Sequence, residues 1–219
     1  MMDFLEEEGL TENTIFVFTS DHGNCLGAHN HVTKSNFWEE SFGVPLIISW
    51  PDKIKHKRTD LLFTPTDFFP TLAGMAGFEI PEVQGMDLSG QILTGTGYEH
   101  DGTLFAYLSF FNIDSIIDGF PGRAWGERGF RTKDYMLLVN KLPGESTDYY
   151  LSNLKEDPFQ LQNIALQNRD LVKEIIEEKL NPKLESIGDE WYKIPVTTES
   201  AYPNNFRELK PKAPVWGLR

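Results

Sequence analysis

A short segment from Ser20 to Lys34, with the sequence SDHGNCLGAHNHVTK, contains most of the side chains that could do chemistry. Asp21 offers a hard carboxylate oxygen and His22 an imidazole nitrogen, so the pair suits a divalent cation. Gly23 follows directly and allows the backbone to turn away sharply. A strand that ends in an aspartate is also typical of a plain turn or helix cap, and on spacing alone this alternative stays open.

Two histidines and a lysine complete the segment. His29 and His31 form an H-x-H pair that could face one way on a strand and bind zinc. The remaining ligands and the basic surface of a zinc nuclease are absent from the sequence, so we expect one histidine to line the pocket of Asp21 and the other to be solvated. Lys34 is a compact cation able to pair with a tetrahedral oxyanion. A solvated surface lysine is the alternative.

The elements that must position this segment are predicted from the runs that flank it. Residues 14–19 (TIFVFT) and 44–50 (VPLIISW) are apolar without polar alternation, which is typical of strands covered on both faces. A helix is predicted over 67–77, capped by Thr66. Strands separated by helical or loop segments predict a parallel sheet. The acidic and basic side chains after residue 19 would then lie at its carboxyl edge, where open α/β sheets bind ligands.

The second half of the chain has a different pattern. Residues 103–110, 127–132 and 134–140 are short strand-like runs broken by Gly, Asp and Pro, which predict a small antiparallel sheet. An amphipathic helix is predicted over about 169–180.

We therefore predict an α/β fold with a mainly parallel sheet and flanking helices over residues 1–100. A small α+β subdomain, in which the antiparallel sheet packs with a helix, is expected over 101–190. An extended tail is expected over 191–219.

The composition argues against several classes of protein. Twenty Lys and Arg against 33 Asp and Glu give a net charge of −13, which argues against nucleic-acid binding driven by counterion release. No run approaches the roughly 18 apolar residues of a membrane-spanning helix. The acidic start, MMDFLEEEGL, does not match a secretory signal. The single cysteine, Cys25, excludes an internal disulfide.

The series of motifs over residues 13–54 resembles the C-terminal half of the catalytic domain of type I sulfatases, in the alkaline phosphatase superfamily. The family pattern is a strand ending T-S-D-[HN]-G, then L-G-x-H, a lysine, [YFW]-E-E-S and V-P-L-I-[IV]-x-x-P, and each element is present here. The similarity continues over 61–89 and in the stretches RTKDYMLLVN and YLSNLKEDPFQLQNIA. It covers about residues 2–166.

The resemblance implies roles for the residues at matching positions. Asp21 and His22 would be two ligands of a divalent cation, usually calcium in this family. Lys34 would contact a sulfate oxygen and the leaving-group oxygen, as a catalytic and substrate-binding residue. His29 would lie near the same pocket. Such a cation and ammonium would stabilise the negative charge that builds up as a sulfate ester is cleaved.

The family's nucleophile is a formylglycine made from the Cys or Ser of a C-x-P-x-R or S-x-P-x-R motif, and neither motif occurs here. Cys25 is followed by Leu-Gly-Ala, so it does not fit. We expect the formylglycine and the remaining acidic metal ligands only in an N-terminal part upstream of Met1. Arg128 and Arg131, in the predicted small sheet, could reach the substrate, and a surface ion pair is the alternative for each.

The sequence thus predicts the C-terminal fragment of a sulfatase, a metal-dependent sulfuric ester hydrolase that is inactive as this fragment alone. Its substrate would be a sulfate ester, for example a sulfated carbohydrate. The full-length protein is expected to be periplasmic, secreted or otherwise extracytoplasmic, and the fragment to self-associate. The alternatives are a non-catalytic truncated or assembly module, and a phosphate or phosphonate ester hydrolase of the same superfamily.

Overall fold

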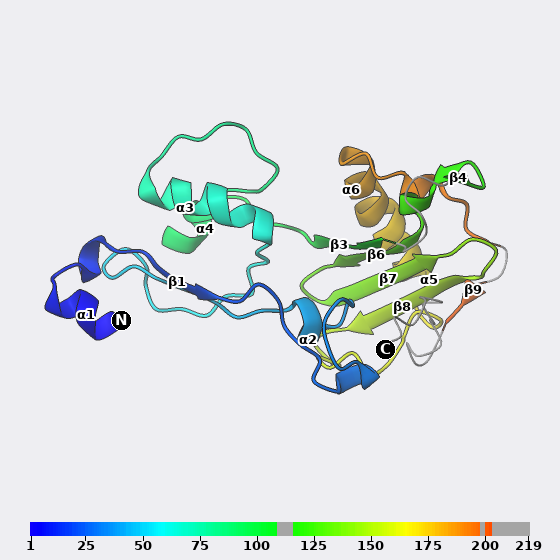
Figure 1. Cartoon of the computed structure of the whole chain (residues 1–219), viewed down its shortest axis with the longest axis horizontal. Coiled ribbons are helices and arrows are strands. Elements are labelled where there is room, and N and C mark those ends of the chain that lie inside the picture. The colour runs from blue at the N-terminus through cyan, green and yellow to red at the C-terminus, as the bar shows by residue number, and fades with distance from the viewer. Residues whose placement is uncertain (109–115, 198–199, 203–219) are drawn as a thin grey trace, which may run out of the picture. The chain divides into compact units, whose positions relative to one another are not determined.

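The computed structural model describes residues 1–108, 116–197 and 200–202 (Figure 1). They form two compact units, each assembled from separate stretches of the sequence. The first unit contains Met1–Asp21 and Val44–Thr103, and the second contains His22–Gly43 and the described residues from Leu104 onward. Most of the segment that carries the candidate chemistry therefore folds with the second unit.

The first unit contains a two-stranded ribbon of β1 (Phe16–Thr19) and β2 (Leu46–Ser49). Its helices are α1 (Met2–Glu7), α3 (Phe68–Ala76) and α4 (Ser89–Leu93), with the 3₁₀ turns η1 (Thr11–Asn13) and η3 (Pro65–Asp67).

β1 and β2 pair antiparallel, with Phe16 opposite Ser49 and Thr19 opposite Leu46. This corrects the parallel arrangement predicted from the sequence. Apolar runs without alternation occur in covered strands of either direction, so the pattern does not determine the direction of pairing. A parallel pair needs a crossover, usually through a helix. The connection between these two strands contains only the short turns η2 (Ala28–Asn30) and α2 (Glu39–Phe42).

The predicted helix over 67–77 is present as α3, but its cap lies earlier than expected. Thr64, not Thr66, forms a capping box with Asp67, and its backbone N–H donates to Asp67 Oδ2 at 2.7 Å. At the other end Gly77 adopts φ 76° and closes the helix in the left-handed conformation.

The second unit is built on a five-stranded sheet in the order β3–β6–β7–β8–β9. β6, β7 and β8 form an antiparallel meander, and β9 runs parallel to β8. The predicted small antiparallel sheet is thus confirmed, although residues 109 and 110 of the first predicted run lie outside the described residues. The strands are β3 (Thr103–Leu108), β6 (Gly126–Arg131), β7 (Tyr135–Lys141), β8 (Thr147–Asn153) and β9 (Ser200–Ala201), beside a hairpin of β4 (Ile116–Ile117) and β5 (Phe120–Pro121).

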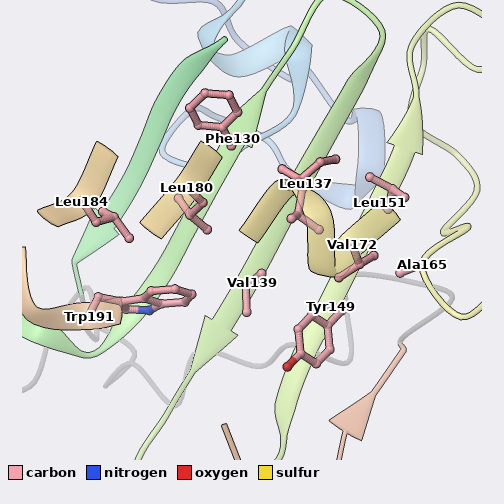
Figure 2. Close-up of a cluster of buried hydrophobic side chains, with 11 residues drawn as sticks. Phe130, Leu137, Val139, Tyr149, Leu151, Ala165, Val172, Leu180, Leu184 and Trp191 are labelled. Atoms are coloured by element: carbon pink, nitrogen blue, oxygen red, sulfur yellow. The ribbon is translucent and has the colours of Figure 1, made fainter. Parts of the chain in front are cut away.

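Helices cover one face of this sheet (Figure 1). The predicted helix over 169–180 begins as α5 (Arg169–Ile175), continues through a π-helical turn, η5 (Ile176–Leu180), and runs into α6 (Asn181–Ser186). The remaining 3₁₀ turns are η4 (Gly122–Ala124) and η6 (Glu190–Lys193). Leu137 and Val139 of β7 face these helices (Figure 2). The buried cluster they share contains Phe130, Leu137, Val139, Tyr149, Leu151, Ala165, Val172, Ile175, Leu180, Leu184 and Trp191.

The opposite face of the sheet is covered by the segment that carries the candidate chemistry. Phe37 and Trp38 of that segment are buried against Met136 and Leu138 of β7. Because both faces are covered, β7 is apolar at successive positions rather than alternating. Residues 22–43 are therefore positioned by their packing against this face of the sheet.

The expected tail over 191–219 is only partly described. Trp191 in η6 is buried in the core of the second unit, and β9 pairs with β8. Residues 198–199 and 203–219 lie outside the described residues. None of the described helices has the length and apolar character needed to cross a bilayer.

Candidate functional site

Asp21 lies two residues beyond the last residue of β1, just past the carboxyl end of the strand, as the sequence predicted. Its side chain is exposed, and Ser20 Oγ donates to Asp21 Oδ1 at 3.3 Å. Asp21 is the last residue of the first unit's N-terminal stretch, and His22 is the first residue of the second unit.

His22 and Lys34, twelve residues apart in sequence, meet in the second unit. His22 Nδ1 lies 2.7 Å from the carbonyl oxygen of Gly23, so Nδ1 must carry the hydrogen and donate it. The other ring nitrogen, Nε2, then has a lone pair, and Lys34 Nζ lies 2.5 Å from it. The ammonium of Lys34 is thus held on the imidazole rather than extended alone into solvent.

Close backbone packing fixes the turn that carries His22. Gly23 N donates to Ser41 O at 2.8 Å. A Cβ at position 23 would lie 2.2 Å from the carbonyl oxygen of Glu40, so only glycine allows this approach. The turn and α2 therefore form one packed layer.

His29 occupies a strained and buried position in the same segment. Its φ of 50° is unusual for a residue with a side chain. The imidazole stacks on Trp38 with ring centroids 3.7 Å apart and planes 7° apart. Its Nε2 lies 3.4 Å from Glu40 Oε2. The structure thus holds His29 against Trp38 and Glu40, and it holds Lys34 on His22.

The H-x-H pair does not adopt the strand geometry that a zinc site would require. Ala28–Asn30 form the 3₁₀ turn η2, so His29 and His31 are not alternate residues of a strand. His31 is half-buried rather than solvated, and burial together with the charge of His29 lowers the pKa of its imidazole. Among the described residues no three His, Cys, Asp or Glu side chains gather closely enough to hold a metal.

Arg131 is the last residue of β6, and it forms a bidentate ion pair with Glu39 at the start of α2. Its Nε donates to Glu39 Oε1 at 2.7 Å and its Nη2 to Oε2 at 3.3 Å. Arg128 is 1% exposed, and its Nε donates to Asp189 Oδ2 at 2.7 Å. Both guanidinium groups therefore form ion pairs, as the alternative expected, although the pair of Arg128 is buried rather than at the surface.

Glu39 and Glu40 had no predicted role, although both lie in the WEES stretch that matches a family motif. Trp38, in the same stretch, is 2% exposed and stacks against the ring of His29. The spacing of an arginine and a glutamate 92 residues apart gives no signal by itself, because the pair forms only when β6 and α2 meet.

The donor set fits part of a divalent-cation site. Asp21 supplies carboxylate oxygens, whereas the lone pair on His22 Nε2 accepts from the Lys34 ammonium, so a cation bound by this nitrogen would have to displace Lys34. A calcium ion takes six to eight oxygen-rich ligands, so two residues would be part of a larger set.

Comparison with known proteins gives the family. A family model described as Sulfatase matches residues 1–78. The ulvan-active sulfatase of Formosa agariphila is 31% identical over 220 residues, covering 95% of this chain and 40% of the relative. The chain belongs to the sulfatase family. The resemblance to type I sulfatases predicted from its motifs is confirmed.

Solved structures confirm the alkaline-phosphatase-like α/β fold of this sulfatase chain. The crystal structure of a yidJ sulfatase from Bacteroides fragilis matches with a TM-score of 0.74 and 38% identity, over 88% of this chain and 40% of that one. The protein BT4656, solved in complex with its substrate D-glucosamine-2-N,6-O-disulfate, matches with a TM-score of 0.63 and 25% identity, over 88% and 37%. The chain thus spans about 40% of the length of the relatives it matches.

Proposed function

We propose that this chain supplies the C-terminal part of a metal-dependent sulfuric ester hydrolase. The observation that carries the proposal is the pairing of Lys34 Nζ with His22 Nε2 at 2.5 Å, on a turn that begins just beyond β1. It puts a cation beside a metal-binding type of side chain within the second unit.

The chemistry of sulfate ester cleavage explains why these groups belong together. Negative charge grows on the sulfuryl oxygens and on the departing oxygen, and donors already in place stabilise it at little reorganisation cost. Lys34 would donate to a sulfuryl oxygen and to the leaving-group oxygen. Asp21 and His22 would hold a divalent cation, calcium, which supplies further positive charge there.

His29 and Arg131 would act differently from one another. Stacking on Trp38 and the contact with Glu40 keep the His29 ring in one orientation, which suits a catalytic residue at the pocket wall. Arg131 was predicted to bind substrate, but two nitrogens of its guanidinium donate hydrogen bonds to the carboxylate of Glu39. This favours a positioning role, in which Arg131 fixes α2 and the turn packed against it.

The nucleophile would be a formylglycine in a segment that these 219 residues do not include, because neither motif that yields one is present. The substrate would be a sulfated carbohydrate, as it is for BT4656 with its D-glucosamine-2-N,6-O-disulfate. The complete protein would act outside the cytoplasm.

Self-association of the isolated chain is part of the proposal. Phe18 and Ile47 lie opposite each other in the β1–β2 ribbon and are 53% and 56% exposed. The sequence predicted that both strands are covered on both faces. In the isolated chain, a second copy of the chain would cover the exposed side chains of Phe18 and Ile47.

A chimera would test the proposed function. This chain would replace the matching segment of the Bacteroides fragilis relative, and the purified chimera would be assayed with 4-nitrophenyl sulfate, with and without a chelator. We expect hydrolysis that the chelator and Asp21→Ala abolish, with Asp3→Ala, on the exposed face of α1, as the matched control. A folded chimera without sulfatase activity, or one indifferent to both treatments, would contradict the proposal. The isolated chain should give no turnover.

A further inference from the structure

A cavity of about 140 Å³ lies in the second unit, at the end of β7. The turn between β4 and β5 contributes Asp118, β5 contributes Phe120, and the residue before β6 contributes Trp125. Lys141, the last residue of β7, completes the wall together with the β7–β8 turn and residues 195–197. A β-strand extends about 3.3 Å per residue, so this end of β7 lies roughly 20 Å from its other end, near the Arg131–Glu39 ion pair.

Lys141, which lines this cavity, carries a buried ammonium. The residue is 5% exposed, and its Nζ donates to the carbonyl oxygens of Trp191 at 3.2 Å and Ile194 at 2.7 Å. Nζ also lies 3.9 Å from the centre of the Trp191 ring, which the core cluster holds in place (Figure 2). An ammonium has three N–H donors, and these contacts use two of them.

No carboxylate forms an ion pair with Lys141 in the described part of the chain. Burial lowers the pKa of its amine to about 8, so the group is still mostly charged at neutral pH. A buried charge without a counterion is unfavourable, and an anion in the cavity would remove that penalty.

Trp125 supplies a second donor that has no acceptor. The residue is 6% exposed, and its indole Nε1 is buried without a hydrogen-bond partner among the described residues. Buried N–H groups are normally satisfied, so an unsatisfied one beside a cavity points to a missing acceptor. The ring of Phe120 stands edge-on to Trp125 with centroids 6.4 Å apart, and the two rings make part of the wall apolar.

We propose that this cavity binds one small oxyanion, a carboxylate or a sulfate group, carried by a compact molecule with an apolar face. The third N–H of Lys141 and the indole N–H of Trp125 would donate to its oxygens, and Phe120 would pack against its body. The volume equals that of about four or five waters, which suits an acid group and a small ring. Asp118 also lines the cavity and opposes an anion there, but its side chain is exposed, so solvent screens this repulsion more than it screens the buried ammonium of Lys141.

The test uses the 219-residue chain labelled with ¹⁵N at its five tryptophans. Sodium sulfate, sodium acetate and sodium benzoate would be titrated in turn, with sodium chloride at matched ionic strength as the reference. We expect the indole N–H signals of Trp125 and Trp191 to shift in a saturable way with at least one oxyanion. Sulfate against acetate identifies the acid group, and benzoate against acetate tests the apolar face.

Three variants would separate ligand binding from a purely structural role. Trp125→Phe keeps the aromatic wall and removes only the unpartnered N–H. We expect the dissociation constant, measured from the indole signal of Trp191, to rise at least about fivefold. The melting temperature should stay unchanged. Lys141→Met should abolish the shift. Lys193→Met removes an exposed charge nearby and should leave binding unchanged.

Saturable binding of at least one of the three oxyanions, with this order among the variants, supports the proposal. Shifts that chloride reproduces, shifts that Trp125→Phe leaves unaltered, or no saturable shift with any oxyanion would overturn it. If Lys141→Met fails to fold because two carbonyls lose their donor, Trp125→Phe decides the matter. None of these outcomes depends on sulfatase activity, so failure here would leave the proposed function untouched.

Discussion

The ammonium of Lys34 contacts His22 Nε2. Replacing Lys34 should have different effects if it is a catalytic residue and if it is an ordinary surface lysine. In the complete hydrolase proposed above, Lys34→Ala should lower kcat by about 10²-fold, the scale for removing one well-placed electrostatic donor. The free energy of unfolding should change by less than about 0.5 kcal/mol, because the side chain is exposed and packs little. Steady-state kinetics and a thermal melt on the same two proteins measure both effects.

Lys155→Ala is the matched control for that prediction. Lys155 is also exposed and pairs with Asp134 at 2.8 Å in the second unit. Its removal should leave kcat at the wild-type value. Wild-type turnover in Lys34→Ala would return Lys34 to an ordinary surface role.

Asp21 and His31 should differ in their importance for metal binding. Asp21 supplies an anionic oxygen that offsets the desolvation of a cation, whereas His31 is half-buried beside His29 in a turn rather than on a strand. In the complete protein, Asp21→Asn should weaken calcium binding by at least about tenfold, and His31→Ala should change it little. Calorimetric titration measures both, and the reverse order would favour a histidine-based zinc site.

At the scale of elements, the turn after β1 depends on one close backbone approach. Gly23→Ala would place a Cβ 2.2 Å from the carbonyl oxygen of Glu40, so the turn or α2 must move. We expect a loss of about 1–3 kcal/mol in the free energy of unfolding, the usual cost of overpacking, measured by urea denaturation. Thr33→Ala, at an exposed position of the same segment, should stay within about 0.5 kcal/mol. Equal stability of the two variants would show that the approach is not tight.

The pairing of elements is the level at which sequence and structure differ most. The apolar runs of β1 and β2 were predicted correctly as strands, but their direction was not. The predicted cover on both faces is also missing from the described structure, where Phe18 and Ile47 are exposed. Side-chain pattern gives the tendency to be buried, whereas the direction of pairing depends on the path of the connection. Similarly, residues 22–43 were assigned with the flanking strands, yet Phe37 and Trp38 pack on the sheet of the second unit. Their apolar character indicated burial and could not identify the surface against which they are buried.

At the scale of the whole molecule, two half-buried acids, Glu127 and Asp148, should make stability depend on pH. Burial raises the pKa of Glu127 to about 7, and burial also raises that of Asp148 to about 6. An acid whose pKa is higher in the folded state stabilises the fold below its unfolded pKa, and this stability is lost as pH rises through the folded value. The free energy of unfolding should therefore fall between about pH 4.5 and pH 7.

Glu127→Gln tests this dependence. The variant should be about 1–3 kcal/mol more stable than wild type at pH 7.5 and nearly equal to it at pH 4.5, in urea denaturation at several pH values. Glu178→Gln, on an exposed part of the helical segment, should follow the wild-type profile. Identical profiles for wild type and Glu127→Gln would mean that Glu127 ionises normally in the folded protein.

The sequence alone determined the family, the strands of the small sheet and the segment that carries the candidate chemistry. Each of these depends on local order along the chain: motif spacing, apolar runs and turn residues. Three contacts were found only in the tertiary structure: the antiparallel pairing of β1 with β2, the ion pair of Arg131 with Glu39 and the contact of Lys34 with His22. These contacts join residues that are 12 or more positions apart, and such contacts form only after the backbone has brought distant elements together. Residue type reveals which groups can interact, and the folded path of the chain selects the ones that do.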